Sequence, residues 1–105
     1  MSQASVSKVL FKKVAFIGLG LIGSSLARVI VAEQLASEIV ASTRSKKTLE
    51  DAKALGLIQH GYTNPEEAVQ GADLIVLALP VRATQKVLEQ IKPYLAENVI
   101  ITDVG

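Results

Sequence analysis

The stretch Val14-Ala15-Phe16-Ile17-Gly18-Leu19-Gly20-Leu21-Ile22-Gly23-Ser24-Ser25-Leu26 decides the fold. An apolar run leads into Gly-x-Gly-x-x-Gly, and apolar residues at helical spacing follow, which predicts a strand, a tight turn and a helix. Gly18 would let the chain turn sharply, Gly20 would let backbone approach a phosphate, and Gly23 would let the helix pack on the strand. The start of this helix would offer unpaired N–H groups and a positive dipole end to an anion.

The composition is typical of one small domain with an aliphatic core. Half of the 105 residues are hydrophobic, and only two Phe and two Tyr are present, which suits buried parallel strands covered by helices. The net charge of +1 does not indicate nucleic acid. The chain has no Cys, which excludes a disulfide and fits a cytoplasmic protein. No apolar run reaches the ~18 residues that would span a membrane.

Strands and helices alternate along the rest of the chain. After a flexible tail over residues 1–11, we expect one domain over residues 12–105. The expected strands are residues 12–17, 38–42, 57–59, 73–79 and 99–102, and the expected helices are residues 21–36, 45 or 47 to 55, 64–71 and 81–95. This alternation predicts a parallel sheet with right-handed crossovers, a Rossmann-type α/β fold with strand order 3-2-1-4-5. Gly56 is the expected cap at the end of the second helix.

Four segments should meet at one edge of this sheet. The turn over residues 18–23 and residues 43–47, 79–81 and 103–105 all follow expected strands. In such folds a ligand binds outside the carboxyl ends of the strands, where the strand order reverses. A lone Gly-x-Gly-x-x-Gly is a weak signal, but the convergence of four segments predicts a dinucleotide site.

The residues after the second strand favour NADP over NAD. An NAD site usually has Asp or Glu there for the ribose 2′-OH, and this chain has Thr43 instead. Thr43 and Ser45 could donate hydrogen bonds to a 2′-phosphate, Arg44 could bind it in a bidentate way and stack on adenine, and Lys46 or Lys47 could add charge. The alternative is a solvated basic helix start, but cations are unfavourable at a helix N-terminus unless an anion binds there.

The remaining candidates point to no catalytic group and no metal site. Leu79-Pro80-Val81 could flank the nicotinamide or simply end a strand. Arg82 and Thr84 could reach phosphate or substrate, but a surface role is expected for both. His60, the only histidine, is expected to be a solvated loop residue, and Asp103 is expected to cap backbone or to touch ligand.

Three motifs together resemble the prephenate/arogenate dehydrogenase family. They are the segments at residues 16–26, with Gly-Leu-Gly-Leu-Ile-Gly-Ser-Ser, at residues 72–81, which end in Leu-Pro-Val, and at residues 101–105, with Thr-Asp-Val-Gly. The resemblance runs from Lys12 to Gly105. It implies oxidation of prephenate or arogenate with NAD or NADP and loss of carbon dioxide, a step of tyrosine biosynthesis that gives 4-hydroxyphenylpyruvate or tyrosine.

By this resemblance, Gly18, Gly20, Leu21, Ile22 and Gly23 form the pyrophosphate turn. Thr43, Arg44 and Ser45 meet the adenosine ribose, and Leu79, Pro80 and Val81 flank the nicotinamide. The family's catalytic histidine, substrate-binding arginine and helical dimerisation domain come later than Gly105. We therefore expect an N-terminal cofactor domain that is inactive alone and whose full-length protein is a homodimer with a small-molecule substrate.

Other functions remain open at this point. The cofactor domain could belong to another 3-hydroxyacid-dehydrogenase-like or imine-reducing oxidoreductase. A dinucleotide-sensing module without catalysis is a second class, although it should be complete at this length. A methyltransferase has a similar glycine loop, but it would need an acidic residue near Thr43 for the ribose of its cofactor.

Overall fold

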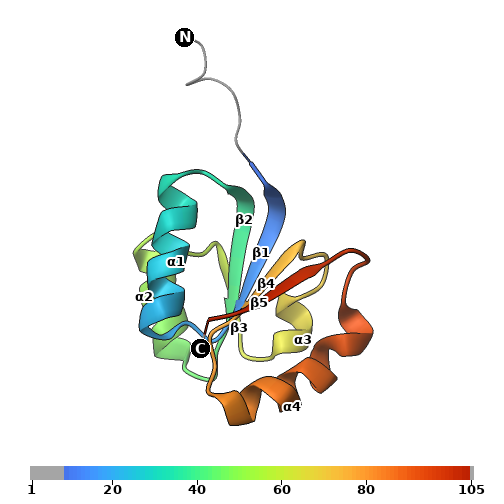
Figure 1. Ribbon diagram of the computed structural model, residues 1–105. Coiled ribbons are helices and arrows are strands. Elements are labelled where there is room, and N and C mark those ends of the chain that lie inside the picture. The colour runs from blue at the N-terminus through green and yellow to red at the C-terminus, as the bar shows by residue number, and fades with distance from the viewer. Residues whose placement is uncertain (1–8, 105) are drawn as a thin grey trace.

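Five parallel strands form one sheet in the order β3-β2-β1-β4-β5, as the sequence predicts (Figure 1). This computed structural model describes residues 9–104, so residues 1–8 of the expected tail and Gly105 lie outside the described residues. The strands are β1 (Phe11–Ile17), β2 (Ala36–Ser42), β3 (His60–Tyr62), β4 (Leu74–Leu77) and β5 (Ile100–Asp103). All four neighbouring pairs are parallel, which places their carboxyl ends at one edge.

Helices cover both faces of the sheet. They are α1 (Gly20–Ala32), α2 (Lys46–Ala54), α3 (Pro65–Ala68) and α4 (Val81–Ile91), followed by the 3-10 helix η2 (Lys92–Tyr94). Figure 1 shows α1 and α2 on one face and α3 and α4 on the other. Successive residues of β1 alternate between two cores, because side chains of a strand point to opposite faces. Val14 and Phe16 pack with α1 and α2, whereas Ala15 and Ile17 pack with α3 and α4.

Helix α1 ends four residues earlier than the predicted Ala36. Gln34 adopts a left-handed conformation with φ of 54°, and the Leu35 N–H donates to the Ile30 carbonyl at 3.0 Å. Such bonds close a helix in the Schellman pattern, which usually has glycine at the left-handed position. Apolar periodicity continues past this point in the sequence and carries no sign of the stop. Gly56 takes the same position after α2, as expected, with φ of 75°.

The prediction of the third strand at residues 57–59 is wrong, because the strand lies three residues later. His60, Gly61 and Tyr62 pair with the end of β2. Leu57 and Ile58 instead enter the core on the side of α1 and α2, from the connection that precedes β3. Their apolar character therefore reflects burial in a loop, while the edge strand, His60–Tyr62, contains no aliphatic residue.

Several other element boundaries differ from the prediction by one to four residues. Strand β1 begins at Phe11, inside the expected tail, β2 begins at Ala36 instead of Glu38, and α3 ends at Ala68 instead of near Gly71. Helix α4 stops at Ile91 instead of Leu95, because Pro93 cannot donate a helical hydrogen bond and the chain tightens into η2. Strand β4 stops at Leu77 instead of Leu79, where the chain begins to turn toward α4. Within residues 9–104, no helix combines the length and apolar character needed to cross a membrane.

Candidate functional site

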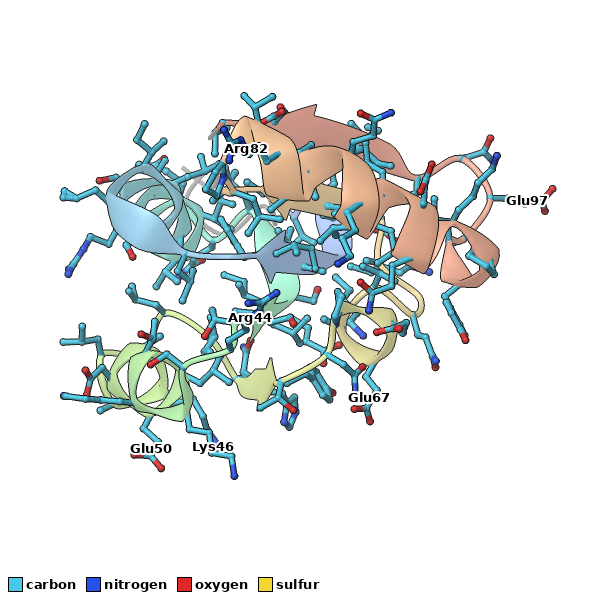
Figure 2. All side chains as sticks on the ribbon, turned by 90° about the horizontal axis from the view of Figure 1, so that it is seen from below. Arg44, Lys46, Glu50, Glu67, Arg82 and Glu97 are labelled. Carbon is cyan, nitrogen blue, oxygen red and sulfur yellow. The ribbon has the colours of Figure 1, made fainter. Side chains whose placement is uncertain are left out.

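Two hollows lie at the carboxyl edge of the sheet, which Figure 2 shows from below. The larger, here called the main cleft, has a volume of about 470 Å³. It lies between the ends of β1, β2 and β3 and the helix α4, and its lining residues are Ile17, Gly18, Ser42, Thr43, Arg44, Thr63, Asn64, Pro65, Leu79, Pro80, Ala83, Val87 and Gln90. The smaller, about 360 Å³, adjoins the start of α1 and is lined by residues 19–23, 78–80 and Val104. Leu79 and Pro80 line both hollows, so the two form one extended surface.

The glycine turn has the geometry that its sequence predicts. Gly18 has φ of 80°, and a Cβ atom there would lie 2.5 Å from the Ala78 carbonyl oxygen. A Cβ on Gly23 would lie 3.1 Å from the Ala78 Cβ, so this glycine brings α1 close to the chain after β4. Around Gly20 nothing lies within 4 Å of the added atom. The turn is therefore tight at Gly18 and open toward solvent at Gly20.

The first turn of α1 offers its N–H groups to this open space. Leu19 at the N-cap makes no side-chain hydrogen bond, and the first turn contains no acidic residue. The side chains of Leu21 and Ile22 are 77% and 61% exposed. An uncapped helix start with free N–H groups and a positive dipole end fits an anion such as a pyrophosphate.

The loop after β2 is held by its own hydrogen bonds. The Thr43 hydroxyl donates to the Ser45 carbonyl and accepts from the Ser45 N–H, both at 3.0 Å. Ser45 Oγ accepts from the Thr48 N–H at 3.1 Å and so caps α2. The Ser45 hydroxyl proton stays available for a ligand, whereas that of Thr43 is used within the loop. This network fixes the backbone that carries Arg44.

The three basic residues of the loop after β2 and the start of α2, Arg44, Lys46 and Lys47, do not all face the main cleft. Among residues 9–104, Arg44 is the one charged residue that lines the cleft, and Figure 2 shows its side chain in the middle of the hollow. Lys46 points away along α2 in the same view. Lys47 Nζ lies 3.1 Å from Asp51 Oδ2, and both side chains are largely exposed. Of the predicted phosphate-binding cations, the structure brings only Arg44 into the cleft.

The loop after β4 forms the shared wall of the two hollows. Pro80 begins α4, and its carbonyl accepts from the N–H groups of Ala83 and Thr84. The Thr84 hydroxyl also donates to this carbonyl at 3.2 Å, so it serves the helix start. Val81 is 82% exposed and lines neither hollow. Arg82 is also exposed, on the first turn of α4, as expected (Figure 2).

The other sequence candidates lie away from these hollows. His60 is exposed, as expected, but it belongs to strand β3 instead of a loop. Asp103 is the exposed last residue of β5 and lines neither hollow. Among residues 9–104 no three His, Cys, Asp or Glu side chains gather in a way that could hold a metal ion.

Sequence reasoning missed one wall of the main cleft. Thr63, Asn64 and Pro65 follow β3, and Val87 and Gln90 lie on α4. The helix-start signal at Asn64-Pro65 could have placed the first three at the same edge, since they follow a strand. Nothing in the sequence indicated that Val87 and Gln90 would line a cleft. An apolar and a polar residue on an amphipathic helix predict only which side of the helix packs against the sheet.

The comparisons with known proteins agree with this geometry. A family model described as NADP oxidoreductase, coenzyme F420-dependent, matches residues 13–104. The chain is 40% identical to the cyclohexadienyl dehydrogenase of Zymomonas mobilis and 38% identical to the prephenate dehydrogenase of Lactococcus lactis, over 95 residues in each case. Both alignments cover 90% of this chain. They cover 32% and 26% of those two relatives, so the chain spans about a third or less of their length.

A solved structure gives the same result. The crystal structure of Synechocystis arogenate dehydrogenase matches with a TM-score of 0.78 and 30% identity, over 89% of this chain and 32% of that one. The expected resemblance to prephenate and arogenate dehydrogenases is confirmed by these matches. The chain belongs to the family described as NADP oxidoreductase, coenzyme F420-dependent, and its relatives include prephenate and arogenate dehydrogenases.

Proposed function

We propose that this chain is the NADP-binding domain of a prephenate or arogenate dehydrogenase. The observation that carries the proposal is the extended surface at the carboxyl edge, with an uncapped helix start at its centre and Arg44 in the main cleft. The dehydrogenase names of two relatives at 38–40% identity favour this reaction over others in the family.

The pyrophosphate of the cofactor would lie against the start of α1. Gly20 leaves open space beside the backbone, and residues 20–23 line the smaller hollow. The N–H groups of the first turn have no side-chain partner to displace. Gly18 lines the main cleft and residues 19–23 line the smaller hollow, so the two halves of a dinucleotide would extend in opposite directions from this turn.

The adenosine half would occupy the main cleft. Arg44 enters the cleft from one side and the apolar residues Ala83 and Val87 line it from α4, which suits a flat ring between a guanidinium and aliphatic groups. NADP is favoured over NAD because Arg44 and the Ser45 hydroxyl could both donate to a 2′-phosphate. Lys47 would contribute a weaker, screened charge from α2, since it is exposed and paired with Asp51.

The nicotinamide half would pass Leu79 and Pro80 toward the smaller hollow, with Val81 at its outer side. When bound, the nicotinamide ring supplies the hydride acceptor of the reaction. The residues of this chain bind and orient the cofactor, and Leu79 and Pro80 shield one side of it from water. The aligned part is about a third or less of the relatives' length, so we assign no substrate binding, proton transfer or dimer formation to these 105 residues and expect no turnover of prephenate by them.

Calorimetric titration with NADP and with NAD tests the proposal. Wild-type protein should bind NADP more tightly, and Arg44→Ala should lower the NADP affinity by about tenfold or more while changing NAD binding less, because a charge-assisted bond to phosphate is lost. Lys46→Ala is the matched control, since Lys46 points away from the cleft (Figure 2). Absence of binding for both dinucleotides would contradict the proposal, and equal affinities would contradict the NADP preference alone.

A further inference from the structure

A side-chain bridge connects α3 to α4 beside the main cleft. Gln90 Nε2 on α4 donates to Glu66 Oε2 on α3 at 2.8 Å. The other carboxylate oxygen, Glu66 Oε1, is buried and has no hydrogen-bond partner within the described part of the chain. The Glu66 carboxylate therefore depends on the amide of Gln90 for its side-chain hydrogen bond.

This dependence fixes the direction of the Gln90 amide. An ionised carboxylate only accepts hydrogen bonds, so the NH2 group of Gln90 must face Glu66. A reversed amide would turn its carbonyl against the carboxylate and leave both Glu66 oxygens without a donor, which is costly for a partly buried charge. Because the NH2 group is used by Glu66, the carbonyl Oε1 is the polar atom of the Gln90 side chain that can bind a ligand. Gln90 lines the main cleft.

The neighbouring amide in the cleft has no such role. Asn64 Oδ1 accepts from the Glu67 N–H at 3.0 Å, and Asn64 Nδ2 donates to Glu67 Oε1 at 2.8 Å. Both ends of the Asn64 amide thus serve the start of α3. The Thr63 hydroxyl can donate or accept, so it cannot distinguish a donor from an acceptor on the ligand. On this wall of the cleft, the Gln90 carbonyl Oε1 is therefore the side-chain acceptor whose orientation is fixed.

We propose that Gln90 selects adenine through its exocyclic amine, and that Glu66 is the positioning residue that keeps the Gln90 carbonyl turned to the cleft. The inference rests on the proposed function. Adenine presents an NH2 group at C6, which can donate to this carbonyl, whereas hypoxanthine presents a carbonyl there and would meet Gln90 Oε1 oxygen to oxygen. The bridge between α3 and α4 thereby determines which purine dinucleotide the cleft accepts.

The test compares NADP with its analogue in which hypoxanthine replaces adenine, by calorimetric titration. Wild-type protein should prefer the adenine form by about tenfold, the loss expected when a hydrogen bond to the Gln90 carbonyl is replaced by two acceptors that face each other. Gln90→Met removes the carbonyl at similar volume, and the preference should nearly disappear. Gln85→Met is the matched control, because Gln85 lies on the same helix but does not line the cleft. It should keep the wild-type ratio.

Glu66→Gln separates positioning from structural support. With an amide at position 66, the Gln90 amide can reverse, so affinity for the hypoxanthine form should rise while that for the adenine form falls. If Glu66→Gln lowered the affinity for both forms equally, Glu66 would have only a structural role. That result would overturn its proposed positioning role. Retention of the adenine preference in Gln90→Met, or its absence in wild-type protein, would overturn the part of Gln90. If neither dinucleotide binds to wild-type protein, the proposed function itself fails.

Discussion

Helices α2 and α3 differ from α1 and α4 in how they begin, although all four start at the same edge of the sheet. Ser45 caps α2 and Asn64 caps α3, and α3 also has Glu66 and Glu67 in its first turn. Helices α1 and α4 begin at Leu19 and Pro80 with no side-chain cap and no acidic residue in the first turn.

The difference distinguishes helix starts that are stabilised within the chain from helix starts whose N–H groups are free to bind a ligand. A side-chain cap satisfies orphan N–H groups within the chain and stabilises a helix by about 1 kcal/mol. Helix α1 lacks this stabilisation, and the space beside Gly20 at its start is open. The chain thus caps the starts of α2 and α3 with its own side chains and leaves the starts of α1 and α4 uncapped, and the start of α1 is the one that the proposed pyrophosphate site uses.

The largest expected effect concerns the turn that leads into α1. Gly18→Ala should lower the free energy of unfolding by about 3 kcal/mol, because the added Cβ would overlap the Ala78 carbonyl in a left-handed backbone conformation. Urea denaturation measures this. Gly56→Ala is the matched control, since Gly56 has a similar φ but nothing within 4 Å of the added atom. Equal losses in the two variants would show that overlap with Ala78 is unimportant.

An acidic residue at the open start should make α1 resemble α3. Leu21→Glu places a carboxylate in the first turn, on a side chain that is 77% exposed. The helix dipole should raise the free energy of unfolding by about 0.5 kcal/mol, while repulsion of the pyrophosphate should lower NADP affinity by about tenfold. Thermal denaturation and calorimetry give the two values. Leu21→Gln supplies the uncharged comparison, and an equal loss of affinity there would assign the effect to shape instead of charge.

Changes at the capped start of α2 should affect stability and cofactor choice separately. Ser45→Ala removes the acceptor for the Thr48 N–H and should cost about 1 kcal/mol of unfolding free energy. Ser45→Asp keeps a cap but adds a negative charge beside the proposed 2′-phosphate, so it should shift binding toward NAD with little loss of stability. Urea denaturation and titration with both dinucleotides measure these effects. An unchanged ratio of NADP to NAD affinity in Ser45→Asp would place the 2′-phosphate elsewhere.

The smallest effect is expected at Lys47. Its ion pair with Asp51 is exposed, so Lys47→Met should change the free energy of unfolding by less than about 0.5 kcal/mol. The affinity for NADP should fall by less than in Arg44→Ala, because solvent screens a charge outside the cleft. If Lys47→Met lowered the affinity for NADP more than Arg44→Ala does, Lys47 would contribute more than Arg44 to NADP binding, contrary to this expectation.

The sequence predicts the fold and the open helix start well, and it predicts the main cleft only in part. Apolar runs and Gly-x-Gly-x-x-Gly report local preferences, and the strand order follows from them through the rules of parallel sheets. Residues such as Leu57 and Ile58 mislead because burial in a connection looks like a strand in a short apolar run. Gln90 lies far in sequence from the glycine turn, and only the packing of α4 beside α3 brings it to the cleft.

The central claim is that the N–H groups at the start of α1 bind the pyrophosphate of the cofactor. An NMR titration of the 15N-labelled chain with NADP tests it amide by amide. We expect the amides of residues 20–22 to move downfield, as donors to a phosphate do, while the capped amides of Thr48 and Glu67 move less. If the amides of α1 stay in place while NADP binds, the pyrophosphate does not lie at this helix start.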